Sequence, residues 1–262
     1  MKSSRKRILW CGLVLAGIGY GSYQYLQKSE ACQVQAQVEA KTIFSFLGAP
    51  GSGKGTLAEQ TINKLGFKVV STGNLCREEI AAGTEKGKMI SEYTRSARLV
   101  PDKVIAEMVD AWLRKNAGDK PIILDGYPRT QEQAKVLLDL LKNKYSTYRF
   151  RVISLDIDDP EMIVQRVANR LVCENKKCQA TYNRKLLKDP SNLVCERCGS
   201  KLIQRDDDRE ETVRRRLLDF KKNNDEIIAF YEKEGVKIEP IAITAKSSPA
   251  GTFEVFKGMV AH

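Results

Sequence analysis

The sequence has almost no histidine: of its 262 residues only the last, His262, is one. Histidine is the most common general base and a frequent zinc ligand in proteins. Its absence from the body of the chain excludes Ser–His and Cys–His nucleophilic schemes, histidine zinc ligands and histidine general bases. Any chemistry must therefore rely on arginine, lysine, aspartate, cysteine and backbone groups.

Acidic residues are also scarce relative to basic ones: 33 Asp and Glu face 44 Lys and Arg, and the formal net charge is +11. This excess favours a polyanionic partner, which includes nucleic acid, an acidic membrane surface and small phosphorylated ligands. The 42% hydrophobic content argues against a largely disordered chain. The length suits one α/β domain with insertions.

The N-terminal segment has the charge order of an export signal. Lys2, Arg5, Lys6 and Arg7 precede an uncharged run from Ile8 to Tyr20. This run has the length of a signal-peptide core, and residues 8–26 together reach a marginal membrane-spanning length. We predict a signal or membrane anchor at 1–27 and a linker at 28–40, with a peripheral apolar extension as the alternative.

From residue 42 onward, apolar strand-like runs alternate with helical stretches. The expected strands are Thr42–Leu47, Phe67–Ser71, Pro121–Asp125, Arg151–Ile157 and 236–243. The expected helices are 54–65, 74–83, 86–97, 102–115, 131–143, 160–170, 209–233 and a C-terminal helix. Strands that are continuously apolar and separated by helices predict an α/β fold with a parallel sheet covered on both faces.

A glycine-rich loop follows the first expected strand and leads into a helix. It reads Gly48-Ala49-Pro50-Gly51-Ser52-Gly53-Lys54-Gly55-Thr56. Glycines allow successive N–H groups to point at phosphate oxygens, the helix N-terminus adds its dipole, and Lys54 adds a mobile charge. The general pattern places Ser or Thr directly after the lysine, whereas Gly55 intervenes here. The alternative is a glycine-rich turn with a chance lysine.

The loop resembles the form Gly-x-Pro-Gly-Ser-Gly-Lys-Gly-Thr of adenylate kinases, and segments 71–77, 99–102, 124–130 and 205–216 also agree with that family. The resemblance covers about residues 42–262. It implies a P-loop kinase domain at 41–262 with a parallel five-stranded sheet flanked by helices. It also implies an AMP-binding helical insertion at 71–100 and a zinc-ribbon-like lid at 171–206.

The implied reaction is reversible phosphoryl transfer from MgATP to AMP, giving two ADP, in a monomeric kinase. The resemblance assigns catalytic roles to Lys54, Asp125, Arg129, Arg170, Arg205 and Arg216. It assigns ATP binding to Gly51, Ser52, Gly53, Lys54, Gly55, Thr56, Arg166 and Arg170. It assigns AMP binding to Thr72, Arg77, Leu99, Val100, Gly126, Arg129, Gln133, Arg205 and Arg216.

Two points about this site rest on the residues themselves. Asp125 ends an expected strand, where a carboxylate can orient the waters of a phosphate-bound Mg²⁺. Arg166 and Arg170 are four residues apart and are expected on one face of the helix that leads into the lid. The chain departs from the family at Asn74, where aspartate is usual, at Ala97, where glycine is usual, and at 244–246, where an Asp-Gly pair is common.

Four of the seven cysteines cluster, as two short-spaced pairs with sixteen residues between them: Cys173, Cys178, Cys195 and Cys198. An odd total in a chain of this size does not indicate a disulfide scaffold. Four thiolates with no open position are typical of structural zinc. Disulfides in an oxidising compartment, unmetallated thiols and a separate nucleic-acid-binding zinc ribbon are the alternatives. No nucleic-acid partner is expected, because Tyr182 is the only aromatic residue that stands out there.

The sequence is also compatible with other functions. The enzyme alternatives are kinases for UMP, CMP or GMP, although the family role of Gln133 and Thr72 favours AMP. A catalytically weak, membrane-tethered nucleotide sensor or zinc-ribbon protein is the alternative from another class. The N-terminal segment predicts a membrane-associated or exported protein. The resemblance favours the cytoplasm instead, because adenylate kinases are usually cytosolic and zinc bound by thiolates suits a reducing compartment.

Overall fold

The computed structural model describes residues 41–96, 98–157, 159–175, 178, 180–205 and 208–261. The predicted signal or anchor at 1–27 and the linker at 28–40 lie outside these residues. Among the helices of the described ranges, none combines the length and the apolar character that crossing a membrane requires.

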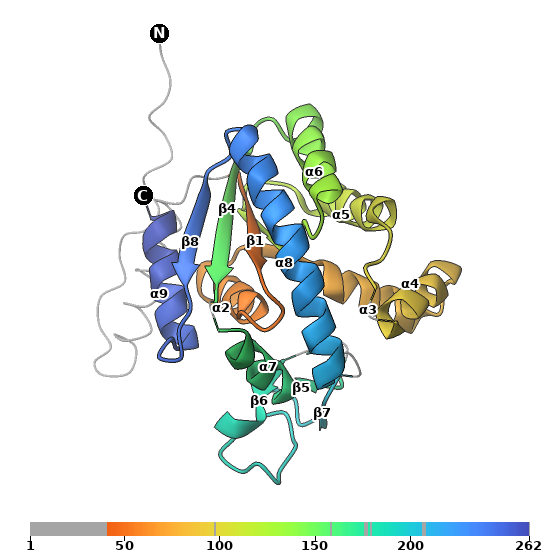
Figure 1. Cartoon of the computed structure of the whole chain (residues 1–262), viewed down its shortest axis with the longest axis vertical. Helices are drawn as coiled ribbons and strands as arrows, with labels where there is room; N and C mark the ends of the chain where they lie inside the picture. The colour runs from red at the N-terminus through yellow and green to blue at the C-terminus, as the bar shows by residue number, and fades with distance from the viewer. Residues whose placement is uncertain are drawn as a thin grey trace, which may run out of the picture.

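A five-stranded parallel sheet forms the centre of the fold (Figure 1). Its strands follow in the order β2 (Lys68–Ser71), β3 (Ile122–Asp125), β1 (Thr42–Gly48), β4 (Arg149–Asp156) and β8 (Ile238–Ala242). Phe46 of β1 is in register with Asp125 of β3 on one side and with Ile153 of β4 on the other. Because all strands are parallel, their carboxyl ends meet at one edge of the sheet. The predicted α/β class and sheet are confirmed.

Helices cover both faces of the sheet, which explains the continuous apolar strands. On one face lie α2 (Lys54–Leu65) and α9 (Pro249–Val260). On the other lie α5 (Asp102–Asn116), α6 (Gln131–Lys144) and α8 (Glu210–Lys233). In β1, Phe44 and Phe46 pack edge-on against the ring of Phe256 of α9, with centroids 5.6 and 5.4 Å away. Ile43 and Leu47 belong to the clusters of the opposite face.

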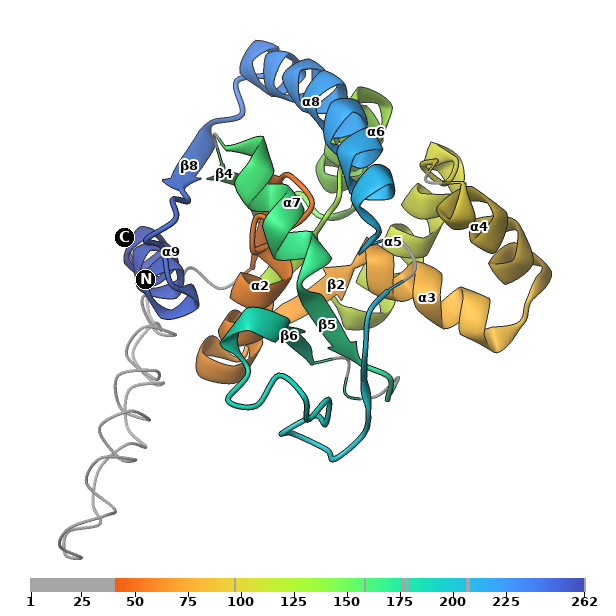
Figure 2. The same cartoon turned by 60° about the horizontal axis from the view of Figure 1, so that its bottom comes forward.

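Two appendages extend from this core, as Figure 2 shows. The first is the helix pair α3 (Thr72–Ala82) and α4 (Glu85–Arg95), which occupies the predicted AMP-binding insertion. The second follows α7 (Pro160–Ala168) and contains a small antiparallel sheet of β5 (Arg170–Cys173), β6 (Thr181–Asn183) and β7 (Leu202–Ile203), with a short 3-10 turn, η1 (Arg184–Leu186). This second appendage is the predicted lid.

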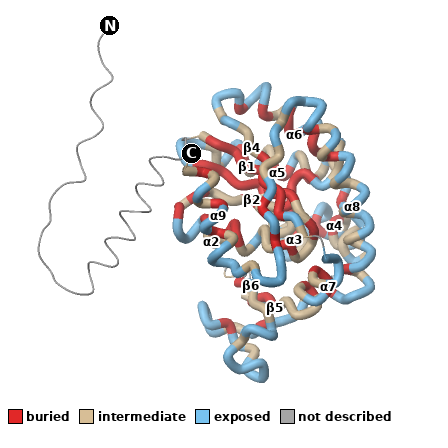
Figure 3. Tube along the Cα trace, turned by 60° about the vertical axis from the view of Figure 1, so that its left-hand side comes forward, coloured by how far each residue is buried: buried red, intermediate tan, exposed pale blue. Residues whose placement is uncertain are grey.

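The lid has a very small interior. Its buried residues, among those described, are Leu171, Val172, Cys173, Ala180, Cys195 and Leu202, and most of the remaining lid surface is exposed in Figure 3. So few apolar side chains cannot stabilise a module of this size by burial alone. Two of these six buried residues are cysteines, which makes their chemistry part of the lid's folding.

One prediction about the lid entrance is wrong. The helix α7 ends at Ala168, where Asn169 caps it by donating its backbone N–H and its Nδ2 to Gln165 O, at 3.2 and 2.8 Å. Arg170 is therefore the first residue of β5 and does not share a helix face with Arg166. Spacing of four residues predicts a shared face only while the helix continues.

Candidate active site

The glycine-rich loop forms a compact cradle at the carboxyl end of β1. At Gly51, φ is +82°, and an added Cβ atom would approach Val167 Cγ2 of α7 to 2.6 Å. Only glycine combines this backbone conformation with such close packing. The Lys54 ammonium reaches back across the loop and donates to Gly48 O at 2.6 Å and to Ala49 O at 2.8 Å. The helix α2 begins at Lys54, so its free N–H groups line the same loop.

Several charged side chains from distant parts of the chain converge on Lys54. Burial lowers the pKa of its ammonium to about 8; the Asp125 carboxylate opposes this shift, and the cations Arg129, Arg216 and Arg170 add to it. Burial also lowers the pKa of the Arg129 guanidinium, and among the neighbouring charges Arg216 has the largest effect and lowers it further. These residues come from α2, β3, the loop after β3, α8 and β5. The fold therefore assembles a buried, strongly positive site.

Asp125 lies directly beside the phosphate loop. It ends β3, next to β1 in the sheet, and a Cβ atom added to Gly55 would lie 3.7 Å from its Oδ2. A carboxylate at this distance from a phosphate cradle can hold the water shell of a divalent cation. Its negative charge also partly offsets the cations around it.

The loop after Asp125 anchors Arg129 against α3. Arg129 Nε donates to Gly126 O at 2.8 Å, and its Nη2 lies 3.4 Å from Thr72 Oγ1. Thr72 Oγ1 in turn donates to Gly126 O at 2.9 Å. Nearby on α3, the Arg77 guanidinium donates to Asn74 Oδ1. The structure thus brings four predicted AMP-binding residues, Thr72, Arg77, Gly126 and Arg129, into one wall.

Gln133 lies in the first turn of α6, next to this wall. Its Oε1 accepts from the Arg129 backbone N–H at 2.7 Å, and its Nε2 donates to Asp102 Oδ1 at 2.8 Å. Of the remaining predicted AMP-binding residues, Val100 is buried, whereas the Leu99 side chain is 37% exposed.

Arg170 and Arg205 lie at the two ends of the lid insertion. Arg170 of β5 donates to both carboxylate oxygens of Asp208, with Nε 2.7 Å from Oδ2, and Asp208 is completely buried. Arg205 accepts the backbone N–H of Asp208 at its carbonyl, 3.1 Å away. Arg166 of α7 points elsewhere: its Nη2 lies 3.4 Å from Thr244 O, in the loop where the chain departs from the family pattern.

The four lid cysteines come together. Their Sγ atoms all lie within 4.8 Å of one another, with Cys173 and Cys198 3.4 Å apart and Cys178 and Cys195 3.8 Å apart. Four sulfurs bound tetrahedrally to zinc at about 2.3 Å are about 3.8 Å apart, which fits this cluster. A disulfide needs about 2.05 Å, and the five cysteines of the described residues are all free.

Comparison with known proteins agrees with this geometry. A family model described as adenylate kinase matches residues 46–236. The adenylate kinase of Archaeoglobus fulgidus is 40% identical over 191 residues, which cover 73% of this chain and 86% of that protein. The chain belongs to the adenylate kinase family. The adenylate kinase of Thermodesulfovibrio yellowstonii is 40% identical over 194 residues (73% and 87%), and that of Kosmotoga olearia is 36% identical over 218 residues (82% and 97%).

Sequence reasoning missed three residues that support this adenylate kinase site. Asp208 forms an ion pair with Arg170, and Asp102 accepts a hydrogen bond from Gln133. Glu59 of α2 forms an ion pair with Arg197, which lies between Cys195 and Cys198. The Asp206-Asp207-Asp208 run was visible in the sequence, but nothing in it singled out the last aspartate. Nothing in the sequence connected Glu59 to Arg197, because they are 138 positions apart.

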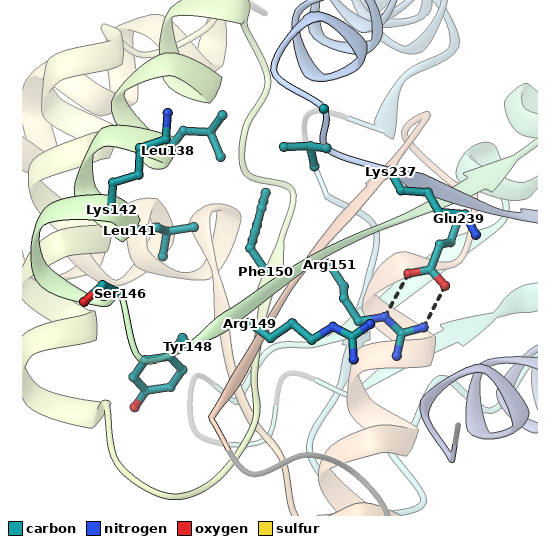
Figure 4. A pocket seen from close by; sticks show the side chains of 12 residues that line it. Leu138, Leu141, Lys142, Ser146, Tyr148, Arg149, Phe150, Arg151, Lys237 and Glu239 are labelled. Atoms are coloured by element: carbon teal, nitrogen blue, oxygen red, sulfur yellow. Dashed lines mark hydrogen bonds and ion pairs between the residues drawn. The ribbon is translucent and has the colours of Figure 1, made fainter.

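A pocket of about 560 Å³ lies away from this site (Figure 4). Its lining residues are Leu138, Leu141, Lys142, Ser146, Tyr148, Arg149, Phe150, Arg151, Gly235, Val236, Lys237 and Glu239. They come from the amino ends of β4 and β8 and the carboxyl ends of α6 and α8, opposite the phosphate loop. Its most buried charges, Arg151 and Glu239, neutralise each other in a bidentate ion pair. The pocket contains none of the predicted site residues and is not the active site.

Proposed function

We propose that this member of the adenylate kinase family transfers the γ-phosphoryl group of MgATP to AMP and forms two molecules of ADP. The observation that carries this proposal is the convergence of Lys54, Arg129, Arg170 and Arg216 with Asp125 on one buried site. Two clusters of anchoring groups, the phosphate loop and the Thr72–Arg129 wall, flank that site. Two phosphate-binding clusters around one set of cations suit transfer between two nucleotides.

The chemistry needs positioning and charge neutralisation. An α-phosphate oxygen of AMP attacks the γ-phosphorus of ATP, the bond from that phosphorus to the β–γ bridging oxygen breaks, and ADP leaves. Lys54 stabilises the β- and γ-phosphates, and Arg129 clamps the attacking phosphate. Arg170, Arg205 and Arg216 neutralise the charge that spreads over the transferring group. No proton needs to be added or removed, which agrees with the lack of histidine.

Mg²⁺ and zinc have different roles in this proposal. Asp125 would hold Mg²⁺ through its water ligands, and the metal supplies charge neutralisation at the triphosphate. Cys173, Cys178, Cys195 and Cys198 would hold zinc, which supplies a structural crosslink for a lid with little core. Arg197, next to Cys198, pairs with Glu59 of α2 and so joins the lid to the phosphate-loop helix. A closed lid excludes water and prevents hydrolysis.

We further propose that residues 1–27 act as a membrane anchor or export signal. The support is the basic-then-apolar order of that segment. The extension joins the domain at the amino end of β1, and the phosphate loop lies at the carboxyl end of the same strand.

Coupled measurement of ADP production tests the reaction, with AMP, UMP, CMP and GMP as acceptors. We expect AMP to be the best acceptor, and Arg129→Ala to lower turnover by about 100-fold, or about 3 kcal/mol, because a charged clamp in a dry site is lost. Arg114→Ala, an exposed arginine of α5 paired with Asp110, is the matched control. ATP binding without turnover on any acceptor would indicate a nucleotide sensor instead.

Lys54 should take up protons when ATP binds. Its pKa of about 8 in the free protein rises next to phosphates, so at pH 8 binding should take up about half a proton per ATP. Calorimetry in buffers of different ionisation enthalpy measures this uptake. It should disappear in Lys54→Met and persist in Lys64→Met, at the other end of α2. Equal uptake in both variants would contradict the assignment.

Cys195→Ser should lower the zinc content and the melting temperature, because one of four ligands is removed from a lid with few apolar residues. Residual kinase activity should remain. Metal analysis and thermal unfolding measure the two effects. Cys76→Ser, a buried cysteine of α3 outside the cluster, should keep the zinc stoichiometry of the wild type. The same zinc content in Cys195→Ser would overturn the metal site.

Alkaline carbonate extraction tests the anchor. Full-length protein should stay with the membranes, whereas a chain that starts at residue 41 should be released. Release of the full-length protein would argue against an integral anchor, and loss of residues 1–40 from the mature protein would identify a cleaved export signal.

A further inference from the structure

Asp102 connects the starts of two helices beside the AMP wall. It is the first residue of α5. Its Oδ1 accepts from Gln133 Nε2 at 2.8 Å, and its Oδ2 accepts from Thr130 Oγ1 at 3.0 Å. Both donors belong to the start of α6, where Thr130 also caps the helix by accepting the backbone N–H of Gln133 at 3.1 Å.

These contacts leave the Gln133 amide only one orientation. A backbone N–H can only donate, and an ionised carboxylate can only accept. With Arg129 N–H on one side and Asp102 on the other, the amide must direct Oε1 to the first and Nε2 to the second. A turned amide would place donor against donor and acceptor against acceptor. Gln133 is 2% exposed, so water would not compensate for such a mismatch.

Each end of the amide retains one further hydrogen-bonding position. A glutamine amide has two N–H donors and two oxygen lone pairs, and the described partners use one of each. The free pair of positions therefore presents a donor and an acceptor in a fixed order. Adenine offers the complementary pair, since its 6-amino group donates and its N1 accepts. A 6-oxopurine offers the reverse, because its O6 accepts and its N1–H donates.

We infer that Asp102 is a positioning residue that holds Gln133 in the orientation that accepts a 6-aminopurine and rejects a 6-oxopurine. This inference rests on the proposed function, in which Gln133 faces the base of the acceptor nucleotide. A freely turning amide could pair with either base, so Gln133 alone does not select AMP. Rejection of the wrong base arises from like groups facing each other in a buried site, which is the strongest form of polar discrimination.

The test compares AMP with IMP, which differ at position 6 and N1. Asp102→Ala leaves only Arg129 N–H to orient the amide. We expect KM for AMP to rise about tenfold, KM for ATP to stay unchanged, and the preference for AMP over IMP in kcat/KM to fall about tenfold, as for loss of one buried charged hydrogen bond. Asp102→Asn should restore the preference, because its Oδ1 can accept from Gln133 while its Nδ2 donates to Thr130 Oγ1.

Two comparisons separate positioning from general destabilisation. Ile227→Val shortens a buried side chain of α8 that packs in one cluster with Ala134 and Leu138 of α6, and it should lower the melting temperature without changing the AMP:IMP ratio. Asp102→Ser, whose side chain is one atom shorter than aspartate, replaces the alanine variant if that variant does not fold.

Each outcome decides the matter. An unchanged AMP:IMP ratio in Asp102→Ala, or an equal rise of KM for AMP and ATP, would overturn the inference while leaving the proposed function in place. Absence of AMP turnover in the wild type would overturn the proposed function itself. Loss of selectivity in Asp102→Ala with rescue in Asp102→Asn supports the inference.

Discussion

The repulsion among buried cations is the constraint on which this structure depends. Arg129, Arg216 and Arg170 each lower the pKa of the Lys54 ammonium, and Arg216 lowers that of Arg129, in a site where burial already disfavours charge. Such a cluster persists only if each cation has a partner. Lys54 has the loop carbonyls, Arg129 has Gly126 O, and Arg170 has Asp208. Phosphates supply the negative charge that this arrangement still lacks.

The parallel sheet brings these groups together. The carboxyl ends of β1 and β3 are adjacent, so the phosphate loop and Asp125 meet without any long connection. The two appendages contribute further side chains around Arg129 and Lys54. Thr72 and Arg77 of α3 complete the wall around Arg129, and the lid brings Arg170 close to Lys54. The lid has so small a core that its cysteines take over part of its folding.

Much of the fold and site was predictable from local sequence. The strand–loop–helix at residues 42–65 is recognisable from one stretch of consecutive residues that contains the glycine-rich loop. The five strands were recognisable because each is a short apolar run between helices. The end of α7 was predicted two residues late. Apolar periodicity continues across Asn169, and only the pairing of Arg170 with Asn183 of β6 shows that β5 has begun. The order of the strands in the sheet also had no signal in any single segment.

The sequence by itself determined where the glycine-rich loop lies, which cysteines cluster and which family the chain resembles, because those properties depend on consecutive residues and short spacings. Only the tertiary structure decided which partner each charged or amide group has. Asp208 with Arg170, Glu59 with Arg197, and Asp102 with Gln133 are contacts between residues 31 to 138 positions apart. Such contacts depend on how whole elements pack, and a short stretch of sequence carries no information about the element that will lie against it.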